Sequence, residues 1–272
     1  MLIIVKTLKI GFVGAGNMAT AIIRGMIGKG GYQPESIFAY DLNPLQLEKI
    51  GELGVQAMAS AVEIVKQCDV VFLAVKPQNY EEVLTGIRQA VAPEKIFVTI
   101  AAGISTEYIM NTLGTPCPVV RAMPNTPLLL GKGATALCKA SNVTDQVFHM
   151  VLDIFAASGD VAVLTEDKMN TVIAVNGSSP AYIYLFAKAV VDWAAAQNIE
   201  NKTALELICK TLEGSAEMLR SSGNTPDELI KMVSSPGGTT LKAMEALKEH
   251  GFYEGLWDAM DQCTKRAEEL GR

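Results

Sequence analysis

The chain has 272 residues, of which 49% are hydrophobic and 19% are charged, and its formal net charge is −6. This composition is typical of a globular protein, and the length allows one large domain or two domains with a sizeable core. The acidic balance, without a basic patch, argues against nucleic acid as a partner, and no run reaches the roughly 18–20 uninterrupted apolar residues of a membrane span.

The N-terminus, the cysteines and the histidines bear on location and chemistry. Met1–Val5 is apolar but short and has no small-residue cleavage site after it, so we expect no signal peptide. The five cysteines are widely spaced, odd in number and without a CxxC pair, which indicates buried structural thiols in a reducing compartment, the cytoplasm. The two histidines, His149 and His250, lie outside any ligand-like pattern, so we predict no metal site.

The first 164 residues alternate between β-rich apolar segments and segments of helix length. Continuous apolar strands joined by helices predict a parallel sheet covered on both faces. The expected strands are Lys9–Val13, Ser36–Tyr40, Val55–Met58, Val70–Ala74, Ile96–Ile100, Val119–Ala122, Gly133–Cys138 and Val161–Leu164. The expected helices are Met18–Gly28, Pro44–Leu53, Tyr80–Val91, Thr106–Leu113 and Thr144–Ala156.

The rest of the chain shows helical patterns and no convincing strand. The expected helices are Glu166–Asn176, Pro180–Gln197, Lys202–Ser221, Pro226–Val233, Thr239–Leu247 and Phe252–Leu270. We therefore predict an α/β protein, with a Rossmann-type dinucleotide-binding domain over residues 1–164 and an all-helical domain over residues 165–272. A small helical domain of this kind favours a core that is completed across a dimer interface. The alternative is a monomer in which these helices pack on the sheet domain.

The segment Gly14-Ala15-Gly16-Asn17-Met18-Ala19 follows the first expected strand and opens the first helix. In a fingerprint of this form, Gly14 permits a tight turn, Gly16 lets the backbone approach a pyrophosphate, and Ala19 keeps helix and strand close. The N–H groups and partial positive charge of the helix N-terminus then favour the phosphates. We predict that this turn binds a dinucleotide; the alternative is a plain strand-turn-helix.

Asp41 ends the second expected strand, at about the usual 20 positions after the fingerprint. A carboxylate there can accept a hydrogen bond from a ribose 2′-OH and would repel a 2′-phosphate, which favours NADH over NADPH. The alternative role is a helix cap before Pro44, for which Asn43 is better placed.

Two further loops are expected at the same edge of the sheet, where ligands bind in open α/β folds. The first is Ala74-Val75-Lys76-Pro77, in which Lys76 either approaches the cofactor or is a solvated surface lysine. The second is Met123-Pro124-Asn125-Thr126-Pro127, in which two prolines bracket Asn125 and stiffen the loop. We expect Asn125 near the nicotinamide, although the rigidity could be purely structural.

Three segments together indicate a family: the turn at residues 14–19, Asn176-Gly177-Ser178-Ser179-Pro180-Ala181-Tyr182, and the stretch Leu229–Leu241, which contains Ser234-Ser235-Pro236-Gly237-Gly238-Thr239-Thr240. The chain resembles the pyrroline-5-carboxylate reductases over essentially its whole length. The resemblance implies NAD(P)H-dependent reduction of the imine 1-pyrroline-5-carboxylate to L-proline, the last step of proline biosynthesis. It also implies a dimer of intertwined C-terminal helices, which in some members assembles into a decamer.

The glycine-rich start of the helix at Thr239 suits the carboxylate of this substrate, because backbone N–H groups can bind it. The resemblance places the substrate at Ser235, Gly237, Gly238, Thr239 and Thr240, with Thr240 near the ring nitrogen as the candidate catalytic contact. The alternative is a simple break between two helices. A protonated imine accepts a hydride directly, so the enzyme mainly aligns the reactants, which agrees with the scarcity of histidine.

One position departs from the family pattern, and two other functions compete. Ser179 stands where the family usually has glycine, so a requirement for positive φ at this position would carry a cost. A β-hydroxyacid dehydrogenase would need a lysine with asparagine four positions on, and no lysine here has one. A nucleotide sensor without catalysis is the other alternative, and the intact Ser234–Thr240 loop argues against it.

Overall fold

The computed structural model describes residues 8–271, so the expectation for Met1–Val5 lies outside the described residues. The contacts divide the chain into two compact units. One runs to Pro180 and takes in the C-terminal segment from Gln262, and the other comprises Ala181–Asp261. The boundary expected at residue 164 stays a prediction.

The first unit is built on one eight-stranded sheet with the order β3-β2-β1-β4-β5-β6-β7-β8. Neighbouring strands are parallel except β6 and β7. The strands are β1 Ile10–Val13, β2 Ile37–Tyr40, β3 Gln56–Ala57, β4 Val70–Leu73, β5 Ile96–Thr99, β6 Val119–Met123, β7 Gly133–Lys139 and β8 Gly159–Val163. The predicted Rossmann-type sheet is confirmed. The antiparallel β6–β7 pair was not foreseen, and it follows from the short link, because a parallel crossover needs about a dozen residues or more.

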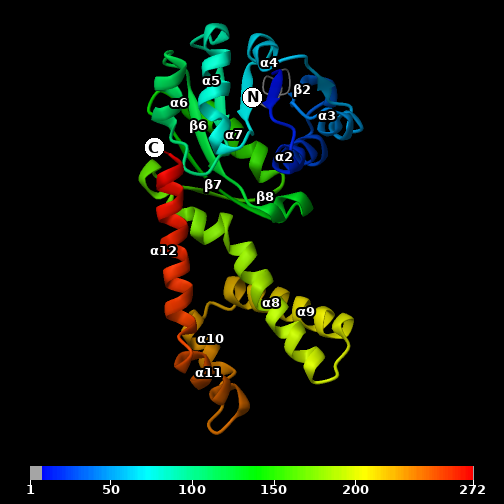
Figure 1. The fold of residues 1–272 in the computed structure, drawn as a ribbon, viewed down its shortest axis with the longest axis vertical. Coiled ribbons are helices and arrows are strands. Elements are labelled where there is room, and N and C mark those ends of the chain that lie inside the picture. The colour runs from blue at the N-terminus through cyan, green and yellow to red at the C-terminus, as the bar shows by residue number, and fades with distance from the viewer. Residues whose placement is uncertain (1–7, 272) are drawn as a thin grey trace. The chain divides into compact units, whose positions relative to one another are not determined.

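Helices cover both faces of this sheet (Figure 1). The α-helices are α2 Asn17–Gly28, α3 Pro44–Gly51, α4 Ala61–Gln67, α5 Tyr80–Ile87, α6 Thr106–Leu113 and α7 Asp145–Ala156. Because the strand order reverses between β1 and β4, right-handed connections place helices on opposite faces. Accordingly α4, α5 and α6 pack in succession, while α2 packs with α7.

The core lies on the central strands, as their apolar sequences predict. Every residue of β1 and β4 is buried. Phe12 and Phe72 stack across these strands with ring centroids 4.6 Å apart, and Phe155 of α7 packs against Phe72. The carboxyl ends of the parallel strands are thereby fixed at one edge of the sheet.

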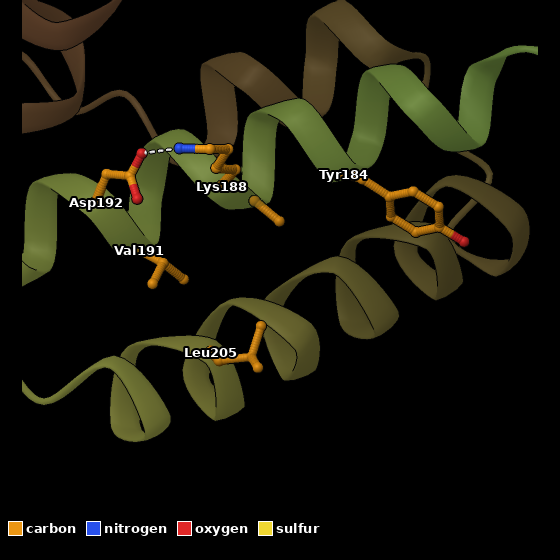
Figure 2. Close-up of a pocket in the computed structure, with 6 residues that line it drawn as sticks. Tyr184, Lys188, Val191, Asp192 and Leu205 are labelled. Carbon is orange, nitrogen blue, oxygen red and sulfur yellow. Dashed lines mark hydrogen bonds and ion pairs between the residues drawn. The ribbon is translucent and has the colours of Figure 1, made fainter.

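The second unit is helical, as predicted. Its helices are the greater part of α8 Ser179–Ala196, then α9 Asn201–Ser221, α10 Pro226–Met232, α11 Thr239–Glu249 and the first half of α12 Phe252–Leu270. Figure 2 shows Tyr184 and Val191 of α8 beside Leu205 of α9, around a shallow apolar hollow that the Lys188–Asp192 ion pair borders. No described helix is both long and apolar enough to cross a membrane.

Three expectations need correction. The helix predicted over Glu166–Asn176 is instead a 3₁₀ turn, Glu166–Lys168, followed by a π-helical segment, Ile173–Gly177. Helix α4, Ala61–Gln67, was not foreseen. The cysteines were expected to be buried, and Cys68, Cys117 and Cys138 are, but Cys209 is exposed and Cys263 is half-buried.

Candidate functional site

The predicted dinucleotide turn joins buried strand β1 to helix α2, and its first glycine is sterically required. Gly14 has φ +100°, and a Cβ there would lie 2.7 Å from the Ala74 carbonyl oxygen. Its N–H donates to the Tyr40 carbonyl at 2.8 Å. The turn therefore lies tightly between the ends of β2 and β4, which only glycine permits.

Gly16 differs from Gly14 because the space beside it is open. A Cβ at Gly16 would meet no atom within 4 Å. Gly16 is the N-cap residue of α2, with no capping side chain and no acidic residue in the first turn of the helix. Asn17 is exposed, Met18 is half-buried and Ala19 is buried. The uncapped N–H groups at the start of α2 can therefore receive an anion that approaches over Gly16.

Asp41 lies directly against the turn. Its Oδ2 accepts a hydrogen bond from the Ala15 N–H at 2.7 Å, and its Oδ1 accepts one from the Asn43 N–H at 2.8 Å. The helix cap before Pro44 is Asn43, whose side chain accepts from the Leu45 N–H at 3.1 Å. Asp41 is therefore not the cap of this helix, and its carboxylate lies beside the turn, where the ribose of the cofactor is predicted.

The loop after β4 lies at the same edge. The Ala74 N–H donates to the Val13 carbonyl at 2.8 Å, which joins this loop to the end of β1. Val75 and Pro77 are half-buried, and Lys76 is exposed before the 3₁₀ turn Pro77–Asn79. The structure thus brings Gly14, Ala15, Asp41 and Ala74 together and leaves the Lys76 amine in solvent.

Asn125 follows β6 at this edge, but its side chain bonds to the protein. Its Oδ1 accepts from the Ala134 N–H at 2.9 Å, and its Nδ2 donates to the Asn176 carbonyl at 3.2 Å. Asn176 in turn donates to the Met123 and Ala134 carbonyls at 2.8 and 2.9 Å, and its buried Oδ1 has no partner. Asn125 therefore anchors the stiff loop to β7 and to the π-helical segment, while its predicted contact with the nicotinamide stays a prediction.

A partly buried polar cluster that was not foreseen lies beside this loop. The Arg121 guanidinium bonds to Glu166 Oε1 at 2.8 Å and to Asn170 Oδ1 at 2.6 Å. Thr106 and Cys138 each donate to Glu166 Oε2 at 3.1 Å. Burial first, and then the Glu166 charge, raises the pKa of the Cys138 thiol well above its usual range, so this thiol stays protonated. The cluster holds residues 166–170 against β6 and β7.

The predicted substrate loop lies in the helical unit, between α10 and α11. Gly237 has φ +72°, so the loop needs glycine there. Gly238 is the N-cap residue of α11, and its N–H donates to the Ser235 carbonyl at 2.9 Å. Thr239 is exposed and Thr240 is half-buried. The first turn of α11 contains no acidic residue and its N-cap has no side-chain bond, so its N–H groups can bind a carboxylate.

Neither histidine lies in these segments. His149 Nδ1 is 2.7 Å from the Asp145 carbonyl, and His250 Nδ1 is 2.9 Å from the Ala246 carbonyl, so each ring sits on its own helix. Over residues 8–271, no cluster of three or more His, Cys, Asp or Glu residues could hold a metal ion.

Comparisons with known proteins point to one family over nearly the whole chain. Residues 166–270 match the family model "Pyrroline-5-carboxylate reductase dimerisation", and residues 9–103 match "NADP oxidoreductase coenzyme F420-dependent". The pyrroline-5-carboxylate reductase of Escherichia coli is 36% identical over 97% of this chain and 98% of its own length. The chain belongs to the pyrroline-5-carboxylate reductase family.

Solved structures of the family share the fold. The Plasmodium falciparum pyrroline carboxylate reductase with NADP bound matches with a TM-score of 0.90 at 27% identity, over 98% of this chain and 99% of its own. The Streptococcus pyogenes 1-pyrroline-5-carboxylate reductase matches with a TM-score of 0.89 at 30% identity, over 96% and 98%. Membership of this family sets aside the β-hydroxyacid dehydrogenase alternative.

The family departure at Ser179 causes no strain. Among the described residues other than glycine, only Asn198 has a positive φ. The Ser179 hydroxyl donates to the Ala174 carbonyl at 2.8 Å, at the start of α8. Serine at this position therefore fits the backbone and adds a hydrogen bond to it.

Proposed function

We propose that this chain is a pyrroline-5-carboxylate reductase, which reduces 1-pyrroline-5-carboxylate to L-proline in the last step of proline biosynthesis. The observation that carries the proposal is the 36% identity to the Escherichia coli enzyme over nearly the full length of both chains. The glycine turn of the first unit and the Ser235–Thr240 loop of the second supply the two kinds of binding site that this reaction needs.

A nicotinamide dinucleotide fits the first unit. The residues that would hold it are Gly14, Ala15, Gly16, Asn17 and Met18 at the turn, Asp41 at the ribose, and Ala74, Val75, Lys76, Pro77 and Asn125 along the sheet edge. The open space at Gly16 and the uncapped start of α2 support a pyrophosphate there. When bound, the cofactor supplies a hydride to the imine carbon, and the imine nitrogen keeps the electron pair of the reduced double bond.

The cofactor preference that we propose is NADH. The Asp41 carboxylate is fixed by two backbone N–H groups beside the turn. A 2′-phosphate would bring negative charge close to the Asp41 carboxylate, which disfavours NADPH. NADPH is the competing cofactor, since the Plasmodium falciparum relative has been solved with NADP bound.

In the second unit, we assign the substrate carboxylate to Ser235, Gly237, Gly238, Thr239 and Thr240. The Thr240 hydroxyl, or a water that it holds, is the candidate contact to the ring nitrogen. With no histidine in the loop, this chain contributes alignment more than acid–base chemistry. Thr240→Ala should lower kcat/KM by about tenfold or more, and Thr240→Ser, which keeps the hydroxyl, should retain most of it. Near-normal kinetics of the alanine variant would remove Thr240 from the site.

The active form that we propose is a homodimer formed through the helical unit. Several large apolar side chains of α8 and α12 are more than half exposed, namely Tyr184, Leu185, Trp193, Tyr253 and Trp257. Surface of this kind is usually covered in the functional assembly. Sedimentation velocity would distinguish this dimer from the decamer that the resemblance also implies. We place the enzyme in the cytoplasm and expect neither nucleic acid nor a membrane as a partner.

The deciding experiment is a steady-state assay with 1-pyrroline-5-carboxylate and either NADH or NADPH. The proposal expects turnover, with a higher kcat/KM for NADH. An absence of turnover with both cofactors, in a protein that binds them, would favour a nucleotide sensor. A large preference for NADPH would refute the role given to Asp41 and leave the reaction intact.

A further inference from the structure

Tyr80, the first residue of α5, is a buried tyrosine at the edge of the sheet that carries the predicted cofactor site. It is 1% exposed, and its hydroxyl donates a hydrogen bond to the Leu73 carbonyl at 2.7 Å. The Thr99 hydroxyl oxygen lies 2.8 Å from the Tyr80 oxygen. Leu73 and Thr99 lie opposite one another in register and are the last residues of β4 and β5. One side chain therefore joins the carboxyl ends of two neighbouring strands.

The groups around the Tyr80 hydroxyl form a chain of hydrogen bonds with one direction. A phenol has one proton, and because Tyr80 donates it to the Leu73 carbonyl, the Tyr80 oxygen accepts from the Thr99 hydroxyl. The Thr99 oxygen in turn accepts from the Ala101 N–H at 3.3 Å. Burial raises the pKa of the Tyr80 phenol above its usual range, so the hydroxyl keeps its proton. The chain thus runs through two buried side chains, from the loop after β5 to the end of β4.

The β4 end of this chain adjoins the predicted cofactor site. Leu73 is followed by Ala74, whose carbonyl oxygen would lie 2.7 Å from a Cβ at Gly14. Tyr80 comes directly after the 3₁₀ turn Pro77–Asn79, so its bond to Leu73 closes the intervening loop onto the strand that it leaves. The position of this loop relative to the dinucleotide turn is therefore set in part by one hydroxyl.

We propose that Tyr80 is a positioning residue for the nicotinamide cofactor, because its hydroxyl holds the loops after β4 and β5 in the arrangement that binds the dinucleotide. The inference rests on the reductase proposed above and adds a residue outside the segments assigned to the cofactor there. Binding to loops that are already ordered avoids the entropic cost of ordering them on association. Without the hydroxyl, only a fraction of the molecules has both loops in place, and the apparent dissociation constant rises by the reciprocal of that fraction.

A second buried tyrosine separates positioning from a purely structural role. Tyr32 is 5% exposed and lies between α2 and β2. This places it at the amino end of β2, which is parallel to β1, and hence at the opposite edge of the sheet from the cofactor. Tyr80→Phe and Tyr32→Phe each remove one phenolic hydroxyl and keep the aromatic ring. A purely structural role predicts similar consequences for both variants, whereas positioning predicts weaker cofactor binding for Tyr80→Phe alone.

Titration of the purified enzyme with NADH and NADPH, followed by nucleotide fluorescence, measures cofactor binding without turnover. For the cofactor that the parent binds more tightly, Tyr80→Phe should raise the dissociation constant at least about fivefold, and Tyr32→Phe should leave it within about twofold. The KM for 1-pyrroline-5-carboxylate at saturating cofactor should stay within about twofold in both. An unchanged dissociation constant in Tyr80→Phe, or an equal rise in Tyr32→Phe, would overturn this inference alone. A parent that binds neither cofactor would overturn the proposed function as well.

Amide hydrogen exchange follows the hydrogen-bond chain itself. In Tyr80→Phe, the Ala101 N–H should exchange at least about tenfold faster than in the parent, because the Thr99 hydroxyl that accepts its bond is no longer held. The Phe97 N–H, which donates to the Pro118 carbonyl within the sheet, should keep its protection and show that the variant is folded. An Ala101 N–H that exchanges as in the parent would refute the chain.

Removal of the second hydroxyl tests whether the two hydroxyls act together. Thr99→Val keeps a branched side chain and takes away the group between Tyr80 and Ala101. If the chain acts as a unit, the double variant Tyr80→Phe, Thr99→Val should bind the cofactor within about twofold of the weaker single variant. Changes in dissociation constant that multiply in the double variant would show two independent contributions and refute the chain.

Discussion

The two glycines of the dinucleotide turn should respond to the same substitution in opposite ways. Gly14→Ala places a Cβ 2.7 Å from the Ala74 carbonyl oxygen at φ +100°. The left-handed conformation costs about 1–2 kcal/mol for a residue other than glycine, and the forced contact adds roughly 1–3 kcal/mol. Gly16→Ala meets no atom within 4 Å and has φ −70°, so its cost in unfolding free energy is limited to that of a poorer N-cap residue, about 1 kcal/mol or less.

The effects on the KM for the cofactor should have the opposite order, with Gly16→Ala the more damaging of the two variants. An added methyl group at residue 16 fills the space through which a pyrophosphate reaches the N–H groups of α2, and losing one charge-assisted hydrogen bond of about 1.5–3 kcal/mol raises the cofactor KM roughly 10–100-fold. Thermal melts and KM values for both variants, measured with the same cofactor, test the reasoning. A Gly16→Ala enzyme with an unchanged KM, or a Gly14→Ala enzyme as stable as the parent, would refute it.

Four other charged groups give expectations of their own. Asp41→Asn keeps an acceptor for the Ala15 N–H but loses the charge, so kcat/KM for NADPH relative to NADH should rise about tenfold; an unchanged ratio would remove that charge from cofactor selection. Glu166→Ala leaves Arg121, whose side chain is 3% exposed, without its carboxylate, and should cost about 3 kcal/mol in denaturant unfolding. Arg121→Met leaves Glu166, which at 37% exposed reaches water, and should cost about 1 kcal/mol; equal losses would contradict this asymmetry. The Thr225 N–H and hydroxyl hold the pKa of Glu228 below 4.5, so this cap stabilises α10 above that pH and is lost as the pH falls through the lower folded pKa; Glu228→Gln should flatten this part of the melting profile.

The sequence predicted the elements whose patterns are local. Strands β1 and β4 are uniformly apolar because both faces of the sheet are covered, and the helices from α8 to α12 follow from their periodicity and break signals. Helix α4 was missed because it has only seven residues and, unlike the equally short α10, no glycine or proline marks its start, although Ser60 and Glu63 form a recognisable cap. Short helices offer too few turns for a periodic signal.

The helix that was wrongly predicted over residues 166–176 shows where local signals fail. Its sequence permits a helix, but Glu166 and Asn170 are bound to Arg121, and Asn176 is bound to the carbonyls of Met123 and Ala134. These partners lie more than 40 positions away in the chain, and together they hold the segment in a 3₁₀ turn and a π-helical turn. The bonds of Asp41 to Ala15 and of Asn125 to Ala134 join residues only 26 and 9 positions apart, but they too depend on the tertiary fold and could not be read from spacing alone.

The two predicted binding sites share one property: each lies at the start of a helix without a capping side chain. Five helices, α3, α4, α6, α7 and α10, begin at an N-cap residue whose side chain accepts a hydrogen bond from a backbone N–H. These residues are Asn43, Ser60, Ser105, Thr144 and Thr225. Helices α2, α9 and α11 have neither a side-chain cap nor an acidic residue in the first turn. Of these, α2 and α11 begin at a glycine, Gly16 and Gly238, whereas the N-cap residue of α9 is the acidic Glu200. An uncapped helix start leaves N–H groups that need an acceptor, and an anionic ligand is the strongest one available. The proposed reaction brings two such anions, the cofactor pyrophosphate and the substrate carboxylate, so the chain leaves open the two helix starts at which they would bind.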